Sequence, residues 1–241
     1  MSTLETIQRD SSLYSARPQT ALMAPDDVRT LLAPAAATSR SPRQERGQRR
    51  LEEILDAAES LITEVGPAAS SIQEIAKRAG ASVGSIYHFF PTKDAIFSAI
   101  RARYDVEASA IAENILAHAT AWSRLDLADF VHHVMSPFAD FLERIPAYFA
   151  LASAAGQRLP KNKDVDATIR AAMLAALAQR WPEVDAEARD LRVHVMMAIG
   201  DGVSNVMVQA DPAGRRLLVA ELTRAVYGYL STFERDLPPR A

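Results

Sequence analysis

The chain has 241 residues, enough for one large domain or for a small domain joined to a larger one. Apolar residues make up 49%, charged residues 24% and aromatic residues 7%, which excludes a wholly disordered or fibrous protein. The absence of cysteine excludes disulfides, thiolate metal sites and cysteine nucleophiles. No apolar run approaches the ~20 residues of a membrane-spanning helix. The first residues also lack the apolar core of a signal peptide, so we expect a cytoplasmic protein without a membrane partner.

Positive charge is concentrated in residues 40–50, which we call the basic segment. Five arginines oppose a single glutamate there, although the whole chain carries a net charge of −3. The arginines are Arg40, Arg43, Arg46, Arg49 and Arg50. Because the remainder of the chain is net acidic, attraction to a polyanion would have to come from this segment.

The first part of the chain has no regular apolar spacing. Residues 1–42 are rich in Ser, Thr, Ala and Pro, which predicts a disordered extension. From Leu51 to Val65, apolar residues recur at helical intervals and predict an amphipathic helix. Gly66 and Pro67 are expected to end it.

Two short helices are predicted next, separated by a tight turn. Ser71 precedes Glu74 with the spacing of a capping box, and the helix should stop at Gly80, which tolerates a left-handed backbone. Ser82 is placed to cap a second short helix over residues 83–88. Two helices joined by about three residues that include a glycine have the helix-turn-helix spacing.

The rest of the chain predicts further helices. After Pro91, Thr92 and Asp94 start a helix that runs to Tyr104. Beyond it the apolar spacing is helical and no sustained strand alternation occurs, so the predicted fold class is all-α. Breaks are expected at Pro137, Pro146, residues 156–160, Pro182 and residues 211–214.

This order of elements predicts three parts. Residues 1–42 form the extension, residues 43–100 a helix-turn-helix domain, and residues 101–241 a larger helical domain. The last two helices, at about residues 184–210 and 213–235, are long and amphipathic.

The stretch from Leu51 to Phe97 resembles the DNA-binding domain of the TetR family of transcriptional regulators. The resemblance is carried by LDAAESLI in the first helix, by IAKRAGAS around the turn and by the block GSIYHFFPTKDAIF. It implies a homodimer with two amino-terminal DNA-binding heads and a carboxy-terminal domain that binds an effector. It also implies a repressor that the effector releases, and phosphate contacts by Tyr87 and Lys93.

The residues after the turn suit close approach to a duplex. A helix that begins with Ser82, Val83, Gly84 and Ser85 presents small side chains and free amides, so its backbone can approach phosphates or base edges. Val83 suits a thymine methyl group, and His88 suits a base edge. The predicted DNA-binding residues are Arg46, Arg49, Arg50, Ser71, Ser82, Val83, Gly84, Ser85, Tyr87, His88 and Lys93.

Several of these residues also have a purely structural explanation. Ser71 and Ser82 are equally explained as helix caps, and Val83 as a spacer. Tyr87 as a core aromatic residue and Lys93 as a solvated lysine are further alternatives. The basic segment alone would be an ordinary solvated face, and its position beside the motif is what favours DNA.

Residues 105–183 are expected to hold a small-molecule pocket. Its candidate lining consists of aromatic and histidine side chains, although aromatic residues at helical spacing are more often core. These candidates are Trp122, Phe130, His133, Phe138, Phe141, Tyr148 and Phe149. His132 and His133 diverge by about 100° on a helix, so no metal and no cofactor are predicted.

The final two helices, within residues 184–235, are predicted to form the dimer interface. Two stripes per chain make a four-helix interface about a two-fold axis, and closure of a monomer core is the alternative. The first stripe comprises Leu191, Val195, Ile199, Gly202, Val206 and Met207. The second comprises Leu218, Leu222, Ala225, Val226, Tyr229 and Phe233.

The sequence does not predict an enzyme. It has neither a Gly-x-Ser-x-Gly elbow nor a Gly-x-x-x-x-Gly-Lys phosphate loop. The expected partners are double-stranded operator DNA, a second copy of the chain and a small-molecule effector. The alternative is a helix-turn-helix activator, or a DNA-binding protein without an effector.

Overall fold

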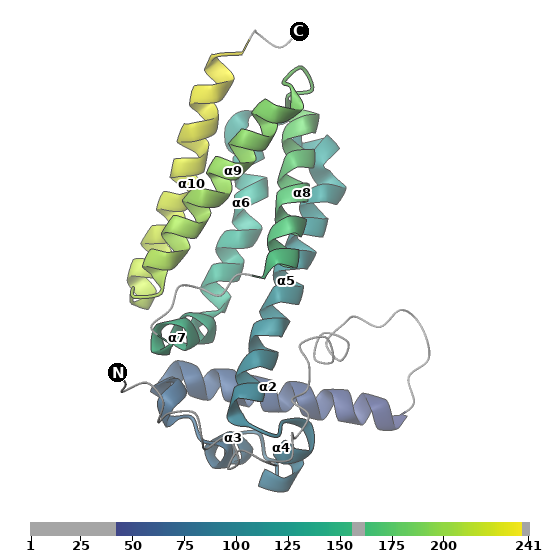
Figure 1. Ribbon diagram of the computed structural model, residues 1–241, viewed down its shortest axis with the longest axis vertical. Helices are drawn as coiled ribbons and strands as arrows, with labels where there is room; N and C mark the ends of the chain where they lie inside the picture. Colours follow the sequence, from purple (N-terminus) through teal and green to yellow (C-terminus); the bar gives the residue numbers. More distant parts are fainter. Residues whose placement is uncertain (1–41, 156–161, 238–241) are drawn as a thin grey trace, which may run out of the picture.

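The computed structural model describes residues 42–155 and 162–237. Within these two ranges the chain forms nine α-helices and no strand, which confirms the predicted all-α fold (Figure 1). The predicted extension, residues 1–42, lies outside the described residues apart from Pro42, at which the first helix begins.

The helix α2, Pro42–Ala69, includes described residues of the basic segment in its first turns. Its backbone departs from helical geometry at Gly66, where φ is +80°, and Pro67 follows. The predicted end of the amphipathic helix is therefore confirmed, because only glycine adopts this left-handed conformation without strain.

The helices α3, Ile72–Arg78, and α4, Val83–Phe89, form the predicted helix-turn-helix. Gly80 has a φ of +58° in the turn between them, as expected. Ile75 and Ile86 are fully buried against α2, so the two helices pack through one apolar face each. We call α2, α3, α4 and the first turns of α5 the head.

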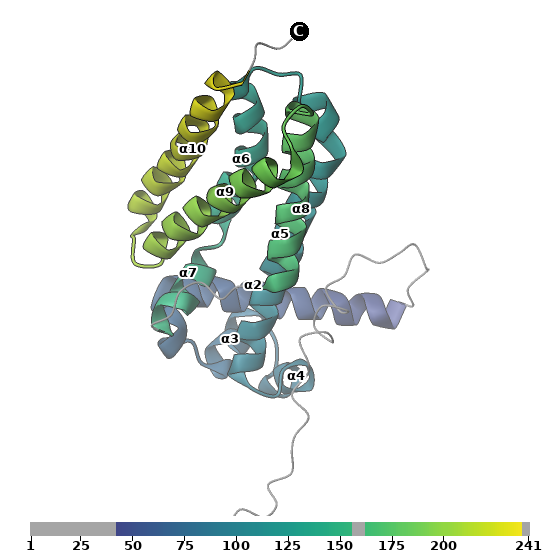
Figure 2. The same ribbon diagram turned by 45° about the horizontal axis from the view of Figure 1, so that its top comes forward.

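The helix α5, Lys93–Trp122, is 30 residues long and connects the head to the rest of the molecule. Figures 1 and 2 both show it rising from beside α4 and α2 into the other helices, which we call the bundle. The boundary expected at residue 100 falls inside this helix. The head and the bundle therefore share a continuous backbone element rather than a loop.

The bundle consists of the upper part of α5 and five more helices. They are α6, Leu127–Arg144; α7, Pro146–Ala154; α8, Lys163–Arg180; α9, Ala186–Met207; and α10, Pro212–Arg235. The last two helices lie where the sequence predicts them. The expected break at residues 156–160 lies outside the described residues.

One predicted break is wrong, because Pro137 lies inside α6. Proline removes one backbone donor from a helix. The side chains on both sides of it, including Val134 and Phe141, are nevertheless buried, and this burial holds the helix together across the proline.

The apolar core is continuous between the head and the near end of the bundle. One cluster runs from Ile54 and Ile86 in the head through Ala108 on α5 to Phe149 on α7 and Val219 on α10. The short helix α7 packs directly on α2. A second cluster fills the far end of the bundle. The head is thus packed on the near end of the bundle as well as joined to it.

Candidate nucleic-acid interface and effector cavity

The helix α4 is anchored on one side and bare on the other. Its Ser82 hydroxyl accepts a hydrogen bond from the amide of Ser85 at 3.1 Å, so the expected cap forms. Ile86 and the following Phe90 are fully buried. Tyr87 is 51% exposed, which rules out the core alternative for this residue.

Gly84 lies on the bare side of α4 and is not required there by internal packing. A Cβ atom added to it would meet only the Ser82 hydroxyl oxygen, at 4.0 Å. His88 is exposed on the same helix, while Val83 and Ser85 are half-buried. The amino end of α4 therefore presents little side-chain bulk to solvent, which suits close approach by a ligand.

Two further predicted contacts flank α4. Ser71 caps α3 by accepting a hydrogen bond from the amide of Glu74 at 3.1 Å. Lys93 donates from Nζ to the carbonyl oxygen of Pro67 at 3.2 Å, and the same nitrogen lies 5.5 Å from the centre of the Phe97 ring. Lys93 is therefore a structural tie within the head rather than a freely solvated lysine.

The described arginines of the basic segment differ in their surroundings. Arg46 and Arg49 are less buried along α2 than the core residues that follow them. Arg50 donates to the carbonyl oxygen of Ala79 at 3.3 Å and pairs with Glu53 at 2.9 Å. Arg50 thus joins α2 to the end of α3, a role that the sequence pattern gives no means of predicting.

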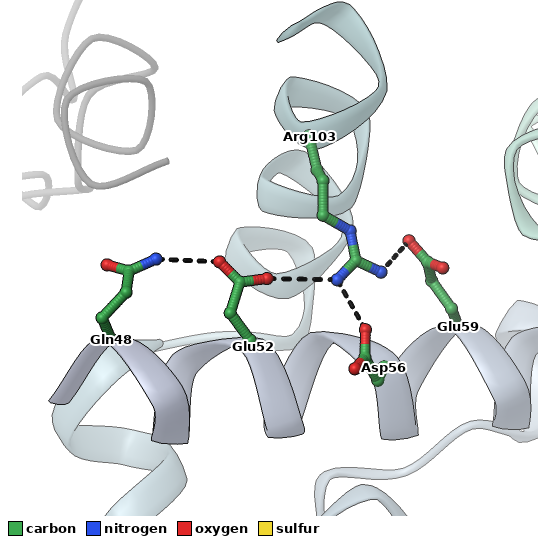
Figure 3. A network of polar contacts seen from close by, with 5 residues as sticks. All are labelled: Gln48, Glu52, Asp56, Glu59 and Arg103. Atoms are coloured by element: carbon green, nitrogen blue, oxygen red, sulfur yellow. Dashed lines mark hydrogen bonds and ion pairs between the residues drawn. The ribbon is translucent and has the colours of Figure 1, made fainter. Parts of the chain in front are cut away.

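Three other acidic residues of α2 meet Arg103 on α5 instead of the arginines of the basic segment (Figure 3). The Arg103 guanidinium lies 2.7 Å from Asp56, 2.5 Å from Glu59 and 3.4 Å from Glu52. Burial by itself lowers the pKa of Arg103, but the hydrogen bonds and charges of Glu59 and Asp56 raise it above its ordinary value. Much of the negative charge of α2 is therefore compensated from within the chain.

A cavity of about 230 Å³ lies in the bundle between α5, α6, α7, α8, α9 and α10. Three of the seven candidate lining residues, Phe138, Phe141 and Tyr148, lie on its wall. Most of the wall, including Met135, Met173 and Met196, could not be predicted from the sequence, because methionines on different helices carry no common spacing signal.

The other four candidates do not line this cavity, and the expectation for them is wrong. Phe130 is fully buried against Trp181 in the second core cluster, with ring centres 6.3 Å apart. Phe149 is fully buried on α7 and lies 4.7 Å from the Arg215 guanidinium. Trp122 and His133 pack against each other instead, with ring centres 5.4 Å apart.

The polar side of the cavity includes Asp105, Asp166 and Tyr148. Asn162 donates a hydrogen bond to Asp105 at 2.7 Å. Burial, then the charge of Asp105, raise the pKa of Tyr148 to about 12, and Arg101 opposes this effect. A mixed wall of this kind, mostly apolar with a few polar groups, is typical of small-molecule sites.

The two predicted dimer stripes have different environments within one subunit. On α9, Leu191 is 54% and Val206 is 58% exposed. Met207 and, on α10, Leu222 and Val226 are buried inside the subunit, so their assignment to an intersubunit surface is wrong. The packing of α10 on α6 and α9 turns these side chains inward.

The outer face of α10 carries a residue that the stripe omitted. Leu217 is 70% exposed, and Tyr227 is 42% exposed. Neither position matches the apolar spacing used for the prediction, which followed the inward face of the helix. Exposed apolar side chains on two adjacent helices are a feature of protein interaction surfaces.

A helix-turn-helix head joined by one long helix to a helical bundle with a cavity is the arrangement expected of a DNA-binding transcriptional regulator. The family model for bacterial regulatory proteins of the tetR family matches residues 54–100. The model for the tetracyclin repressor-like C-terminal domain matches residues 126–230. The chain belongs to the TetR family of transcriptional regulators.

Solved structures to which the chain is similar include the fatty acid degradation regulator FadR from Bacillus halodurans. It is 16% identical, with a TM-score of 0.48, over 79% of this chain and 97% of its own. A tetR-family regulator from Streptomyces coelicolor is 21% identical over 76% and 83% of the two chains, with a TM-score of 0.47. The repressor AlkX from Dietzia sp. strain DQ12-45-1b is 20% identical over 81% and 98%, with a TM-score of 0.43. No curated protein sequence matches the chain significantly. In the two described ranges, no helix is both long and apolar enough to cross a bilayer.

Proposed function

We propose that the protein is a ligand-responsive repressor, which binds operator DNA in the cytoplasm as a homodimer and is released by a small-molecule effector. The observation that carries the proposal is the bare amino end of α4. A Cβ atom added to Gly84 there would meet only the Ser82 hydroxyl, at 4.0 Å, and further along the helix Tyr87 is 51% exposed beside fully buried Ile86. A helix that is buried on one face and carries small side chains at its amino end is suited to entering a major groove.

The proposed DNA contacts divide by chemistry. Val83, Gly84 and Ser85 at the amino end of α4, and His88 near its carboxyl end, read base edges in the groove. The remaining residues contact phosphate oxygens and position the head. These are Arg46, Arg49, Arg50, Ser71, Ser82, Tyr87 and Lys93. Capping does not exclude Ser71 or Ser82, because a capping hydroxyl leaves the neighbouring amides free to face a phosphate.

The homodimer is proposed to form through α9 and α10, within residues 184–235. Leu191, Val206 and Leu217 supply the exposed apolar surface, and Gly202 allows the partner's backbone to come close. A two-fold axis would pair the two helices of each subunit into a four-helix interface. Two heads are required because half-sites in a duplex lie about 34 Å apart.

The conformational change that releases DNA is proposed to be transmitted from the cavity to the head along α5. This helix begins at Lys93 in the head, and Tyr104 and Asp105 on it line the cavity. An effector releases DNA only if it binds better to a conformation whose heads no longer match the groove spacing. Operator DNA must then weaken effector binding by the same factor.

In this proposal the chain divides by task, with residues 43–100 contacting DNA and residues 101–241 binding the effector and dimerising. The continuous helix α5 supports a direct mechanical connection between the two tasks. Residues 1–42 have no assigned role in it.

The experiment is selection of duplexes from a random pool by the full-length protein, followed by gel-shift titration of the selected sequence. We expect an imperfect palindrome with two half-sites, bound by two copies of the chain. A metabolite screen by thermal shift then tests the effector. Absence of a selected sequence would refute DNA recognition, and a sequence-specific protein that no metabolite affects would favour the regulator without an effector.

A further inference from the structure

Arg103 on α5 forms ion pairs with three carboxylates of α2 in the head. Its three carboxylate partners, Glu52, Asp56 and Glu59, lie four and three residues apart on α2, so they share one helical face (Figure 3). Arg103 is 22% exposed and Glu59 is 21% exposed. Charged hydrogen bonds from a planar guanidinium are directional, which distinguishes this contact from apolar packing.

Apolar packing alone holds the head less specifically. The short helix α7 covers part of α2, and buried Ala147 and Phe149 contribute to this packing. Such contacts resist separation of the two helices and restrict how they cross, but they are less directional than a charged hydrogen bond. A group with fixed geometry defines the orientation of the head relative to α5 more sharply, and Arg103 is such a group.

The next residue, Tyr104, connects the same contact to the cavity. Its ring lines the cavity wall and packs edge-to-face on Tyr148 and Phe141, with ring centres 5.5 Å and 6.4 Å apart. Tyr104 is 5% exposed, and its hydroxyl has no hydrogen bond of good geometry among the described residues. Tyr104 and Glu59 also line a common hollow between α2 and α5. Burial, then the charge of Glu59 and a hydrogen bond toward it, raise the pKa of Tyr104, so the hydroxyl faces this carboxylate.

We propose that Arg103 is a positioning residue, which fixes the head against α5 through the carboxylates of α2, and that Tyr104 makes this contact respond to occupation of the cavity. The inference rests on the proposed release of DNA by an effector, and it adds the residues that carry the response. A buried hydroxyl whose hydrogen bond is poorly formed is costly, so a better bond to Glu59 partly offsets the cost of displacing Tyr104 from its packing.

An occupant of the cavity would supply that drive. It would contact the rings of Tyr104, Tyr148 and Phe141, and displacement of Tyr104 toward α2 brings its hydroxyl to the carboxylate that Arg103 holds. Glu59 then divides its oxygens between two donors, and α2 moves relative to α5. The two arrangements differ in which donor holds Glu59, which is the two-state element that coupling between distant sites requires.

The first test measures the spacing of the two heads. The chain contains no cysteine, so Ala68→Cys places one spin label on each head of the dimer, and the label-to-label distance is read directly. We expect Arg103→Gln to broaden this distance distribution. If the conformation whose two heads fit both half-sites falls to about a tenth of the population, affinity for the selected duplex falls about tenfold. Arg103→Lys keeps the charge without the planar fork, so its distance distribution and DNA affinity should be intermediate between those of the wild type and those of Arg103→Gln.

The matched control is Arg170→Gln, which removes an ion pair between α8 and α9 inside the bundle. It should leave both the distance distribution and DNA affinity at the wild-type level. If Arg103→Gln does not fold, Asp56→Asn replaces it. This variant removes one of the three ion pairs at the partner that is 70% exposed, and should broaden the distribution in the same direction. An unchanged distribution in Arg103→Gln, or in Asp56→Asn when Arg103→Gln does not fold, overturns the positioning role.

The second test fills the cavity without an effector. Ala108 is buried on the cavity wall, so Ala108→Phe places a ring in the space that an effector would occupy. We expect it to shift the head-to-head distance and weaken DNA binding. Adding Tyr104→Phe should restore both, because only the hydroxyl that reaches Glu59 is removed. Adding the matched Tyr148→Phe should restore neither, and equal behaviour of the two tyrosine variants overturns the role of Tyr104.

These outcomes separate this inference from the proposed function. A wild-type protein that selects no duplex, or that gives no head-to-head distance because it is monomeric, refutes the proposed function. If the wild-type protein selects a duplex and gives a head-to-head distance, but Arg103→Gln and Ala108→Phe change neither this distance nor DNA affinity, only the coupling is refuted.

Discussion

Lys93 and Pro67 are joined by a hydrogen bond of 3.2 Å from the lysine ammonium group to the proline carbonyl oxygen. The bond ties the first residue of α5 to the segment that follows the left-handed Gly66, so it closes the head across the end of α2. An ammonium group has three donors, and two of them stay available for a phosphate.

Replacement of Lys93 should therefore affect both stability and DNA binding. We expect Lys93→Met to lower the free energy of unfolding by about 1 kcal/mol, the usual contribution of one such hydrogen bond. DNA affinity should fall further, because the variant has no positive charge to place near a phosphate. Urea unfolding and gel-shift titration of the same preparation measure the two effects. Wild-type DNA affinity in a destabilised variant would leave Lys93 a structural role only.

Tyr87 and its neighbour Ile86 offer a clean separation of binding from folding. Tyr87→Ala should weaken DNA binding with little change in melting temperature, because half of the side chain is exposed. Ile86→Ala should instead cost about 2–5 kcal/mol of stability, because Ile86 is fully buried. Calorimetry with gel-shift titration tests the pair, and a Tyr87→Ala protein that binds like wild type would remove this residue from the interface.

The basic segment should contribute sequence-independent affinity. Replacing Arg46 and Arg49 with Gln should flatten the slope of log affinity against log salt by up to ~2, about 0.9 for each phosphate that is no longer neutralised. Arg50→Gln should behave differently, because Arg50 also bonds Ala79 and Glu53 and its removal destabilises the head. A salt series by fluorescence anisotropy measures the slope, and an unchanged value would make these arginines an ordinary solvated surface.

The dimer surface is tested on the outward side chains. Val206→Glu combined with Leu217→Glu should give a folded monomer with greatly reduced operator affinity, because both residues are exposed in one subunit. Leu222→Glu should unfold the protein, since it would bury an unpaired charge at a cost of several kcal/mol. Sedimentation with circular dichroism distinguishes the two results. A stable dimer of the double variant would locate the interface elsewhere.

The raised pKa of Tyr148 predicts that the free energy of unfolding decreases at high pH. Its folded pKa is raised to about 12 from 10.0, so above pH 10 the unfolded chain releases the phenol proton while the folded chain keeps it. Stability from this group is complete below pH 10 and decreases as the pH rises toward 12. Urea unfolding at several alkaline pH values should show a shallower decrease for Tyr148→Phe. An equal decrease in both proteins would contradict the raised pKa.

The sequence alone determined those features that depend on local geometry. The helix end at Gly66, the caps at Ser71 and Ser82, and the left-handed Gly80 each follow from the preference of one residue type for one backbone conformation. The all-α fold and the helix-turn-helix followed from periodicity and spacing for the same reason.

The tertiary structure decided which face of each helix meets another. Leu222 and Leu217 on α10 are both leucines in a helical pattern, yet one is buried and the other is 70% exposed. Periodicity identifies an apolar face, but a helix with two apolar faces gives no sign of which one its own chain covers. The dimer stripe was misassigned for this reason.

The same limit applies to contacts between residues far apart in the chain. Arg103 meets three carboxylates about fifty residues earlier, and only three of the seven predicted lining residues reach the cavity. Such encounters depend on how α5 crosses α2 and on how six helices enclose a space. These crossing angles are set by the packing of the whole core, and no short segment of sequence encodes them.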